Sequence, residues 1–490
     1  MALSAGLRDA ILEDEFSYPS SEAVACIPPA FAAAFDVLPF RLFEGELHVI
    51  VTNQDDESLL NRIRAVSGMR VRASSATREW IRSCLKIAYS DEAIEPAGTF
   101  QRGDAPPAIR AIDDLHDAAV SSGASDIHIE PTGDGGRVRY RIDGMLHEVR
   151  RLPAPMLAQI VSRVKLLAGM DIADKRQPQD GRYHVDAAGK SIDARVSSMP
   201  TIGGEKVVIR LLDMHASIPT LERLGIAPDM LERYRARIHA PHGFVVVCGP
   251  TGSGKTTTLY ASLNERNVEG QHICTVEDPV EARLPGVAQV QVHPRAGLTF
   301  ASALRSFLRQ DPNVIMVGEM RDSETASVAI SAALSGQLVV ASIHASDAPR
   351  TVDRLVELGL KRHAIAAGLS GVVAQRLVRE LCEHCRLPVT IAAADAEDLR
   401  LGRSASVYEA RGCERCNGSG YRGRIGIFEF LAVTNGVRAA IATGESSVSL
   451  AEMAAADGYE PMVSDGIRCV LHGRTSIEEL RRVLSIGAVS

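Results

Sequence analysis

Mainly apolar runs alternate with amphipathic stretches in the second half of the chain. Four of these runs are residues 244–248, 273–276, 314–317 and 338–343. A strand that is buried on both faces of a sheet has this pattern, and strands separated by helices form parallel sheets. The second half is therefore predicted to be an α/β domain built on a parallel sheet.

A two-residue alternation marks the region between residues 109 and 213. In residues 137–142 every second side chain is apolar, and the opposite face consists of Arg137, Arg139 and Arg141. Successive side chains of a strand point to opposite faces, so this pattern predicts a strand with one buried face. With a helical stretch and further strands beside it, the region is predicted to be a small α+β domain. The arginine row is interpreted as a solvated sheet face.

The length of 490 residues is enough for about three domains at roughly 150 residues each. Clustered Pro and Gly between residues 95 and 107 are typical of a linker. Thr475 and Glu478 have the spacing of a capping box that opens the last helix. The predicted parts are an N-terminal domain (1–94), a linker (95–108), a middle domain (109–213), a linker (214–225), an α/β core (226–380), a cysteine-containing segment (381–425) and a C-terminal helical segment (426–490).

Composition and charge exclude several classes of protein. Hydrophobic residues make up 46% of the chain, which is typical of globular domains and not of disordered ones. The net charge is −7, which argues against general attraction to nucleic acid or anionic lipid. Charged residues interrupt the start before any apolar stretch long enough for a signal peptide, and the longest uncharged apolar run, residues 364–374, is too short to span a membrane. We therefore expect a cytoplasmic protein whose membrane association is peripheral.

A phosphate-binding motif follows the first strand of the predicted sheet. Residues 249–256 have the G-x-x-x-x-G-K-T spacing, between a strand and a helix-like stretch. Small residues let backbone N–H groups close around phosphate, while Lys255 can reach the terminal phosphates and the Thr256 hydroxyl can bind Mg²⁺. The motif predicts a site for ATP and Mg²⁺ made by Gly249, Pro250, Thr251, Gly252, Ser253, Gly254, Lys255, Thr256 and Thr257.

Acidic residues follow two later strands, where ligands of such sheets bind. Glu277 ends the strand 273–276 and opens the acidic stretch 277–281, and Glu319 follows the strand 314–317. Glu319 occupies the place of the metal-linked acid of P-loop enzymes and is our choice to polarise the attacking water, with Glu277 as the second candidate. His344 ends the next strand, where it can sense the terminal phosphate or serve a structural purpose.

Four of the nine cysteines form two Cys-x-x-Cys pairs, Cys382 with Cys385 and Cys413 with Cys416, separated by 27 residues. Two such pairs can supply four thiolates to one Zn²⁺ at tetrahedral angles. Unmetallated turns or redox dithiols are the alternatives. A closed set of four thiolates predicts a structural zinc and not a catalytic one.

In these motifs the sequence resembles the secretion ATPase family, the hexameric motors of type II secretion and type IV pilus assembly. The phosphate loop, the acidic stretch 277–281, residues 319–325 and residues 336–344 are similar, in order, to the family's P-loop, aspartate box, Walker B segment and histidine box. Other segments that look like the family are residues 124–131, 179–182, 193–197 and 375–379.

The resemblance implies an α/β multidomain protein: a small partner-docking N-terminal domain, a PAS-like α+β middle domain, and a RecA-like P-loop ATPase domain with a tetracysteine zinc insertion. It also implies that arginines surround the nucleotide, some of them acting across subunit or domain boundaries. Phosphoryl transfer spreads negative charge that a permanently charged guanidinium stabilises. The arginines that match are Arg182, Arg195, Arg305 and Arg309.

Two departures from the family pattern occur near His344. Gln337 stands where the family usually has histidine, and Ala345 and Ser346 replace a usual Thr-Asn pair. Gln337 can form hydrogen bonds but cannot take up a proton, which puts the role of this position in doubt. We do not expect the change to abolish ATPase activity.

The predicted function is a homo-hexameric ATPase that drives pseudopilus assembly in type II secretion, at the inner face of the inner membrane. Its expected partner is the cytoplasmic domain of an inner-membrane secretion platform protein, through which it is held peripherally on the membrane. The nearest alternative is the extension motor of type IV pili. A nucleic-acid translocase is disfavoured by the net charge, so no nucleic acid is expected as a partner, and a zinc scaffold that binds nucleotide without turnover is the remaining alternative.

Overall fold

The computed structural model describes residues 19–43, 45–89, 107–214, 217–399, 401–402 and 405–485. The chain divides into two compact units, Met1–Arg110 and Ala111–Ser490. The first 18 residues and most of the predicted linker 95–108 lie outside the described residues.

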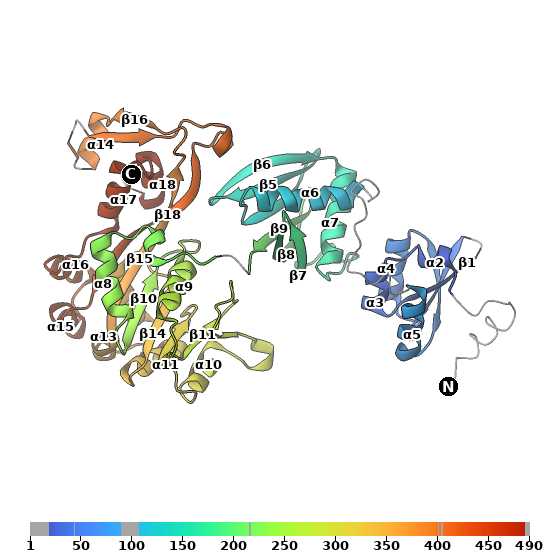
Figure 1. Cartoon of the computed structure of the whole chain (residues 1–490), viewed down its shortest axis with the longest axis horizontal. Helices are drawn as coiled ribbons and strands as arrows, with labels where there is room; N and C mark the ends of the chain where they lie inside the picture. Colours follow the sequence, from blue (N-terminus) through green and yellow to red (C-terminus); the bar gives the residue numbers. More distant parts are fainter. Residues whose placement is uncertain are drawn as a thin grey trace. The chain divides into compact units, whose positions relative to one another are not determined.

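The first unit is a three-stranded sheet with helices packed on it, coloured blue in Figure 1. The middle strand pairs antiparallel with one neighbour and parallel with the other. The helix α4 lies between the second and third strands. The Asp56 side chain caps its start by accepting a hydrogen bond from Leu59 N, and Gly68, in the left-handed conformation, ends it. The elements are α2 (Ser21–Val24), α3 (Pro29–Phe35), β1 (Leu38–Phe43), β2 (Glu46–Val51), α4 (Glu57–Ser67), β3 (Arg70–Ser75) and α5 (Arg78–Ala88).

The second unit begins with a six-stranded antiparallel sheet of strand order β6-β5-β4-β9-β8-β7. Two helices place apolar side chains such as Ile112 and Ile160 in one core with Ile127 of the central strand β4. These elements are α6 (Pro107–Ser121), β4 (Asp126–Thr132), β5 (Gly135–Ile142), β6 (Met145–Leu152), α7 (Ala154–Leu167), β7 (Gln179–Ala187), β8 (Lys190–Thr201) and β9 (Gly204–Leu212).

The arginine row of β5 forms an ion-pair network across the sheet. Glu130 of β4 is 6% exposed and accepts hydrogen bonds from Arg137 Nε and Arg139 Nη2, both at 2.9 Å. Lys206 Nζ of β9 lies 2.8 Å from the same carboxylate. The row is therefore more than a solvated face, because the neighbouring strand supplies an acidic side chain that becomes visible only in the sheet register.

A seven-stranded sheet forms the centre of the rest of this unit, in the order β12-β11-β13-β14-β10-β15-β18. The first six strands pair parallel, and β18 pairs antiparallel with β15. The predicted parallel sheet and the α/β multidomain organisation are confirmed. The strands are β10 (Gly243–Cys248), β11 (Ile273–Glu277), β12 (Ala288–Gln291), β13 (Val314–Val317), β14 (Leu338–Ile343), β15 (Leu369–Leu381) and β18 (Tyr421–Ala432).

Both faces of this sheet are buried, as its apolar strands predict. Phe244, Val246 and Cys248 of β10 belong to one core cluster, while Val245 and Val247 belong to the other. The helices α8 and α9 supply the second cluster, and α10 to α13 supply the first. The helices are α8 (Pro228–Ile238), α9 (Lys255–Arg266), α10 (Phe300–Phe307), α11 (Ser323–Leu334), α12 (Ala348–Glu357) and α13 (Arg362–Gly368).

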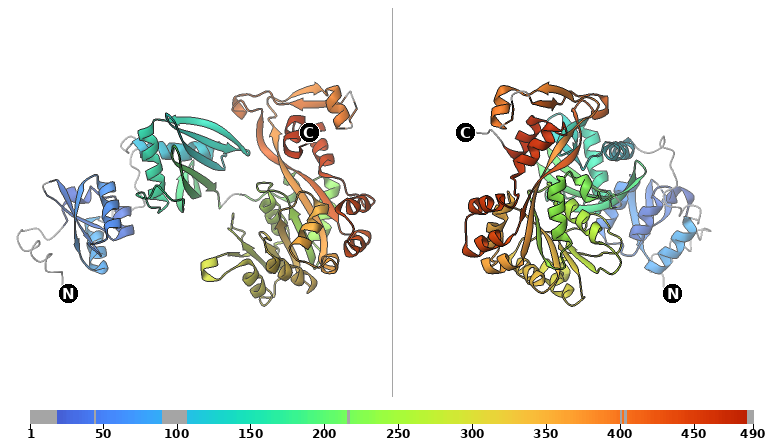
Figure 2. Two further views of the ribbon diagram at one scale, coloured as in Figure 1. Left: turned by 180° about the vertical axis from the view of Figure 1, so that it is seen from behind. Right: turned by 60° about the vertical axis from the view of Figure 1, so that its left-hand side comes forward.

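The C-terminal part, in orange and red in Figure 2, consists of a two-stranded ribbon and short helices. The predicted cap of the last helix is wrong by one residue: Ser476 Oγ accepts from Glu479 N, whereas the Thr475 hydroxyl donates to Arg379 O of β15 at 2.9 Å. The elements are β16 (Leu387–Thr390), α14 (Ala393–Asp398), β17 (Ser406–Glu409), α15 (Asn435–Thr443), α16 (Ser447–Ala455), α17 (Met462–Leu471) and α18 (Ile477–Leu484).

The Glu130 network gives the stability of the antiparallel sheet a pH dependence. Burial raises the pKa of Glu130, but hydrogen bonds from Arg139, Lys206 and Arg137 outweigh it and bring the pKa down to about 2. A carboxyl group with a depressed pKa stabilises the fold above its unfolded pKa, and this stabilisation is lost as the pH falls through the folded pKa. Glu130→Gln should therefore destabilise β4, β5 and β9 by on the order of 2 kcal/mol at pH 7.

Urea-dependent hydrogen exchange of peptides from these three strands measures this difference in the intact chain. The difference in the free energy of unfolding between wild type and Glu130→Gln should become smaller as the pH falls from the ordinary carboxyl pKa of 4.5 to about 2. Glu148→Gln, at a salt bridge whose Arg151 side chain is 77% exposed, is the control and should change stability by less than about 1 kcal/mol. A difference in stability that stays the same at pH 2 would show that the ionised Glu130 carboxylate is not its source.

Candidate functional site

The carboxyl ends of four parallel strands meet at one edge of the large sheet. Cys248 of β10 pairs with Ile343 of β14, and Val317 of β13 pairs with Ala341 of β14 and with Val276 of β11. The residues that follow these ends line a cavity of about 370 Å³. Residues 251–257 of the predicted phosphate loop line it, as do Glu277, Glu319 and His344.

The phosphate loop has the backbone that its glycines predict. Gly249 has a φ of 153° and Gly254 a φ of 87°. A Cβ atom on Gly249 would lie 2.5 Å from Ser253 Oγ and 2.6 Å from Gln375 O, so no larger residue fits there. Gly254 is the N-cap of α9, and the N-terminus of that helix therefore opens into the cavity. Its free N–H groups are suited to bind an anion.

Lys255 lies folded over the loop. Its Nζ donates to Gly249 O and to Pro250 O, each at 2.9 Å. Burial lowers the pKa of Lys255, and the charge of Glu319 opposes this shift. These two carbonyls hold the ammonium group over the loop, at the end of a long and flexible side chain.

Glu319 lies between an arginine and a histidine. Its carboxylate lies 2.7 Å from Arg321 Nη2 and 2.8 Å from His344 Nε2. Burial raises the pKa of Glu319, but Arg321, His344 and Lys255 outweigh it, so the pKa lies below its ordinary value and the group is ionised at neutral pH. An ionised carboxylate beside the phosphate loop can accept a hydrogen bond from water.

His344 contacts two acceptors at once. Its Nδ1 lies 3.2 Å from Gly249 O, and its Nε2 faces Glu319. The side chain thereby joins the phosphate loop to the acid of the neighbouring strand.

Glu277 is already saturated by donors. It is 2% exposed, and its carboxylate accepts from Thr275 Oγ1 at 2.5 Å, from Gln289 Nε2 at 3.2 Å and from the Tyr260 hydroxyl. A buried carboxylate that accepts three hydrogen bonds has little capacity left to bind a water molecule. This environment favours Glu319 over Glu277 as the group that faces water.

Glu281 is a cavity residue that our selection of site residues left out. Desolvation of its carboxyl group and the charge of Glu277 raise its pKa, and a hydrogen bond with Thr256 opposes the shift. Thr256 carries the hydroxyl predicted to bind Mg²⁺, so this contact places a second oxygen ligand at the same point. The acidic stretch 277–281 contained the signal, but the sequence did not show which of its members faces the loop.

The four predicted arginines do not line the cavity. Arg305 of α10 forms an ion pair with Glu324, and Arg309 donates to Arg305 O at 2.8 Å. Arg182 of β7 and Arg195 of β8 face each other across the antiparallel pair. The structure thus brings the arginines together in two pairs, and the charge of Arg195 acts on Glu281 of the cavity.

Gln337 lies at the end of the sheet opposite the phosphate loop. Its backbone carbonyl accepts from Gly243 N, where β10 begins, whereas the loop follows Cys248, where β10 ends. The glutamine that departs from the family pattern therefore does not line the cavity beside the phosphate loop.

The two cysteine pairs come together into one cluster. The sulfur atoms lie within 4.8 Å of one another, and three of the separations are 3.7, 3.8 and 3.9 Å. Tetrahedral zinc with Zn–S bonds of about 2.3 Å places sulfur atoms about 3.8 Å apart. The cluster of Cys382, Cys385, Cys413 and Cys416 therefore fits zinc without rearrangement.

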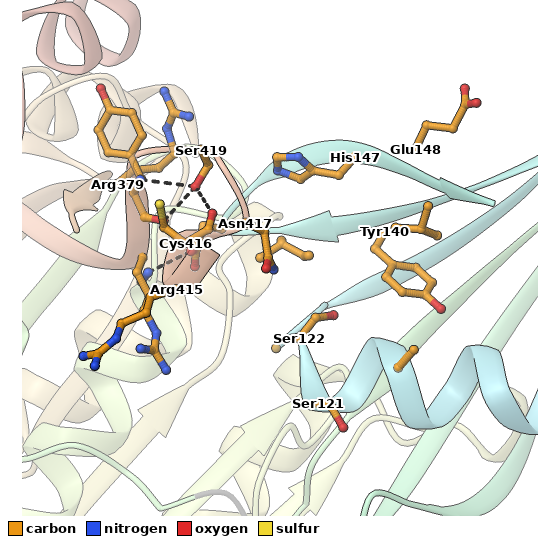
Figure 3. Close-up of a pocket in the computed structure, with 18 of the residues that line it drawn as sticks. Ser121, Ser122, Tyr140, His147, Glu148, Arg379, Arg415, Cys416, Asn417 and Ser419 are labelled. Atoms are coloured by element: carbon orange, nitrogen blue, oxygen red, sulfur yellow. Dashed lines mark hydrogen bonds between the residues drawn. The ribbon is translucent and has the colours of Figure 1, made fainter. Parts of the chain in front are cut away.

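Backbone N–H groups around the second cysteine pair stabilise the thiolate form of Cys416. Burial raises the pKa of Cys416, but the N–H groups of Cys413 and Gly420, which donate to its sulfur at 3.1 and 3.2 Å, bring the pKa down to about 6. Figure 3 shows Ser419 beside Cys416, and its hydroxyl donates to Cys416 O at 2.7 Å. Metal ligands must be deprotonated, so these bonds favour metal binding.

Comparison with known proteins places the chain in a family. Residues 101–482 match the family described as type II/IV secretion system protein, which is more than half of the chain. The chain belongs to this family. Residues 9–95 match the MshEN domain. The resemblance seen in the sequence motifs is thus confirmed, and the chain is a secretion ATPase of this family.

Curated relatives of this secretion ATPase include proteins of both machineries. The type II secretion system protein HxcR of Pseudomonas aeruginosa is 46% identical over 393 residues, covering 80% of this chain and 81% of that protein. The type II secretion system protein E of Pectobacterium carotovorum is 38% identical over 481 residues, covering 93% and 96%. The type IV pilus assembly ATPase PilB of Thermus thermophilus is 39% identical over 96% of this chain, and the chain spans 55% of that protein.

Solved structures share the fold of the secretion ATPase. The ATPase DotB of Legionella pneumophila has a TM-score of 0.57 at 21% identity, covering 78% of this chain and 97% of that chain. The pilus retraction motor PilT with bound ADP has a TM-score of 0.51 at 24% identity, covering 76% and 96%. Among the described residues, no helix has the length and apolar character needed to span a bilayer.

The cysteine cluster predicts one tightly bound zinc per chain. Cys413→Ser or Cys416→Ser should reduce the zinc content of purified protein, measured by mass spectrometry of the metal, from about one to near zero, because the remaining three thiolates no longer close a tetrahedral site. Cys26→Ser, in the first unit, is the control and should retain the full zinc content. Full zinc content in both cluster variants would show that these cysteines do not bind the metal.

Proposed function

We propose that this secretion ATPase hydrolyses ATP to drive pseudopilus assembly in type II secretion. The observation that carries the proposal is the cavity where the phosphate loop, Glu319 and His344 meet. Relatives that cover most of the chain and are named as type II secretion proteins support this machinery. ATP hydrolysis by such a motor is coupled to the movement of other protein subunits.

Each group of cavity residues has a separate role in ATP binding and hydrolysis. Backbone N–H groups of residues 254–256, at the N-terminus of α9, and the Lys255 ammonium bind the phosphates. Thr256 and Glu281 supply oxygen ligands to Mg²⁺, which neutralises phosphate charge when it is bound. Glu319 accepts a hydrogen bond from the attacking water and orients it, and His344 links that acid to the loop. The four cysteines hold a structural zinc.

The arginines act in an assembled hexamer. Arg195 is the cross-strand neighbour of both Arg182 and Arg210, and like charges placed opposite each other destabilise a sheet. Arg210 is paired with Asp126 at 3.0 Å, but in the part of the chain that the structure describes neither Arg182 nor Arg195 has an ion-pair partner. Glu281 of the cavity offsets part of this repulsion through its interaction with Arg195 and Arg210, and we infer that phosphates bound by a neighbouring subunit or domain supply the remaining negative charge.

The first unit docks on the membrane machinery. It forms a compact unit of its own, and it matches a domain separate from the family region. Its proposed partner is the cytoplasmic domain of an inner-membrane secretion platform protein. This contact holds the motor peripherally at the cytoplasmic face of the inner membrane.

Assembly of type IV pili is the second candidate function. The Thermus relative named as a type IV pilus assembly ATPase matches 96% of the chain, including the first unit. The catalytic residues are the same in both proposals, so the partner decides between them.

Two substitutions test the catalytic roles. Lys255→Ala removes the cation that binds the phosphates, and Glu319→Gln removes the charge that orients water while keeping the shape of the side chain. Each should lower the rate of phosphate release from the assembled protein by at least about a hundredfold. Glu357→Gln, at an exposed salt bridge of α12, is a matched control that should leave the rate unchanged.

Mixed assemblies test whether the arginines act between subunits. Arg182→Ala and Lys255→Ala chains should each be inactive alone, and mixing them should restore a measurable fraction of the rate, because some interfaces then pair an intact Arg182 with an intact Lys255. Substantial activity of Lys255→Ala or Glu319→Gln alone would overturn the role of that residue. No recovery on mixing would place Arg182 in the same subunit as the phosphates it serves.

A binding experiment separates the two machineries. The full chain should bind the cytoplasmic domain of the type II secretion platform protein at least about tenfold more tightly than the corresponding type IV pilus protein from the same cell, which corresponds to roughly 1.4 kcal/mol. A chain that begins at residue 107 is the control and should bind neither. The reverse preference would establish the pilus function and exclude the secretion function.

A further inference from the structure

One buried side chain of β15, that of Gln375, forms hydrogen bonds with the phosphate loop and with α9. Gln375 is 1% exposed and lies 122 residues from Ser253 in the sequence. Its Nε2 donates to Ser253 O at 2.6 Å, and its Oε1 accepts from Thr258 Oγ1 at 2.7 Å. One amide thus joins the loop to the first turns of α9, and a primary amide is suited to this because it donates and accepts at the same time.

The bond to Ser253 O controls the next N–H group. Ser253 C=O and Gly254 N–H belong to one planar trans peptide unit, in which they point in opposite directions. When Ser253 O is turned toward Gln375, the Gly254 N–H is turned away from Gln375. Gly254 lines the cavity, at the N-terminus of α9. The hydrogen bond therefore directs an N–H donor to the side where phosphate binds.

This peptide unit has little else to hold its orientation. Gly254 has no Cβ and a φ of 87°, so the peptide before it can rotate at small steric cost. The Gln375 amide lies close to Gly254, because a Cβ atom on Gly254 would be only 3.1 Å from Gln375 Nε2. Thr258, itself 1% exposed, holds Oε1 and so keeps Nε2 aimed at Ser253 O.

We propose that Gln375 is a positioning residue that fixes the Ser253–Gly254 peptide so that its N–H faces the nucleotide phosphates. The inference rests on the proposed function of the cavity as an ATP site. Gln375 does not touch the phosphates, and its effect passes through the loop backbone. The loop is thereby organised before the nucleotide arrives, which reduces the cost of ordering it on binding.

Three variants separate the two bonds. Gln375→Glu keeps the acceptor for Thr258 but loses the donor to Ser253 O and sets a carboxylate against a carbonyl. Gln375→Met removes both bonds at similar volume. Thr258→Val removes only the bond that aims the amide. Gln159→Glu, at an exposed position of α7, repeats the charge change elsewhere and is the control.

The measured quantity is the ratio of the affinities for ADP and adenosine, determined by competition with a fluorescent ADP analogue on the full chain. Loss of a directed N–H weakens binding of the phosphates alone, so Gln375→Glu and Gln375→Met should lower this ratio by about tenfold or more, and Thr258→Val by a smaller factor. Gln159→Glu should leave it unchanged. A purely structural role would reduce the folded fraction and weaken both ligands equally.

The Lys255→Ala variant separates a failure of the proposed nucleotide site from a failure of the positioning role of Gln375. If it lowers the ADP-to-adenosine ratio and neither Gln375 variant does, the cavity is a nucleotide site and the positioning role is wrong. If Lys255→Ala leaves the ratio unchanged, the nucleotide site itself is wrong. Should Gln375→Glu fail to fold, Gln375→Met and Thr258→Val still decide, because unchanged ratios in both overturn the inference.

Discussion

The parallel register of β11, β13, β14 and β10 is the constraint on which the rest of the structure depends. Because each strand is buried on both faces, charged side chains are admitted only where a strand ends. The four carboxyl ends lie at one edge, so the phosphate loop, Glu277, Glu319 and His344 converge there although almost a hundred residues separate the first from the last. A shift of register by one residue would separate Glu319 from His344.

Buried polar side chains then hold the loops at that edge in one arrangement. Ser342 Oγ donates to Gly318 O at 2.6 Å and ties the turn before Glu319 to β14. Glu429 of β18, 3% exposed, accepts from Ala348 N at 2.6 Å and from Met462 N at 2.8 Å, so one carboxylate serves the N-termini of two helices. Leaving such groups unpaired costs about 1–3 kcal/mol each, which disfavours other loop arrangements.

The cysteine segment relies on a different source of order. Its own ribbon has only two strands, β16 and β17, and two-stranded ribbons are marginal alone. Its smallest core cluster consists of cysteines: Cys382, Cys385 and Cys416, with Cys413 packed against them. At the other end, Arg379 of β15 binds Glu479 of α18 at 2.7 Å. The cysteines and this ion pair therefore add to the apolar contacts of Ile391, Ala396 and Val407, which belong to the large core cluster.

The sequence by itself determined the local features of this protein: the apolar strands, the glycines of the phosphate loop, the acidic residues at strand ends and the spacing of the cysteines. These follow from periodicity and backbone sterics, which depend on a few neighbouring residues. The tertiary structure alone decided that Gln375 supports Ser253, that Glu281 faces Thr256, that Glu130 pairs with the arginine row, and that Gln337 lies away from the phosphate loop. Each of these contacts depends on which strands become neighbours and in what register, and a pattern within one segment does not contain that information.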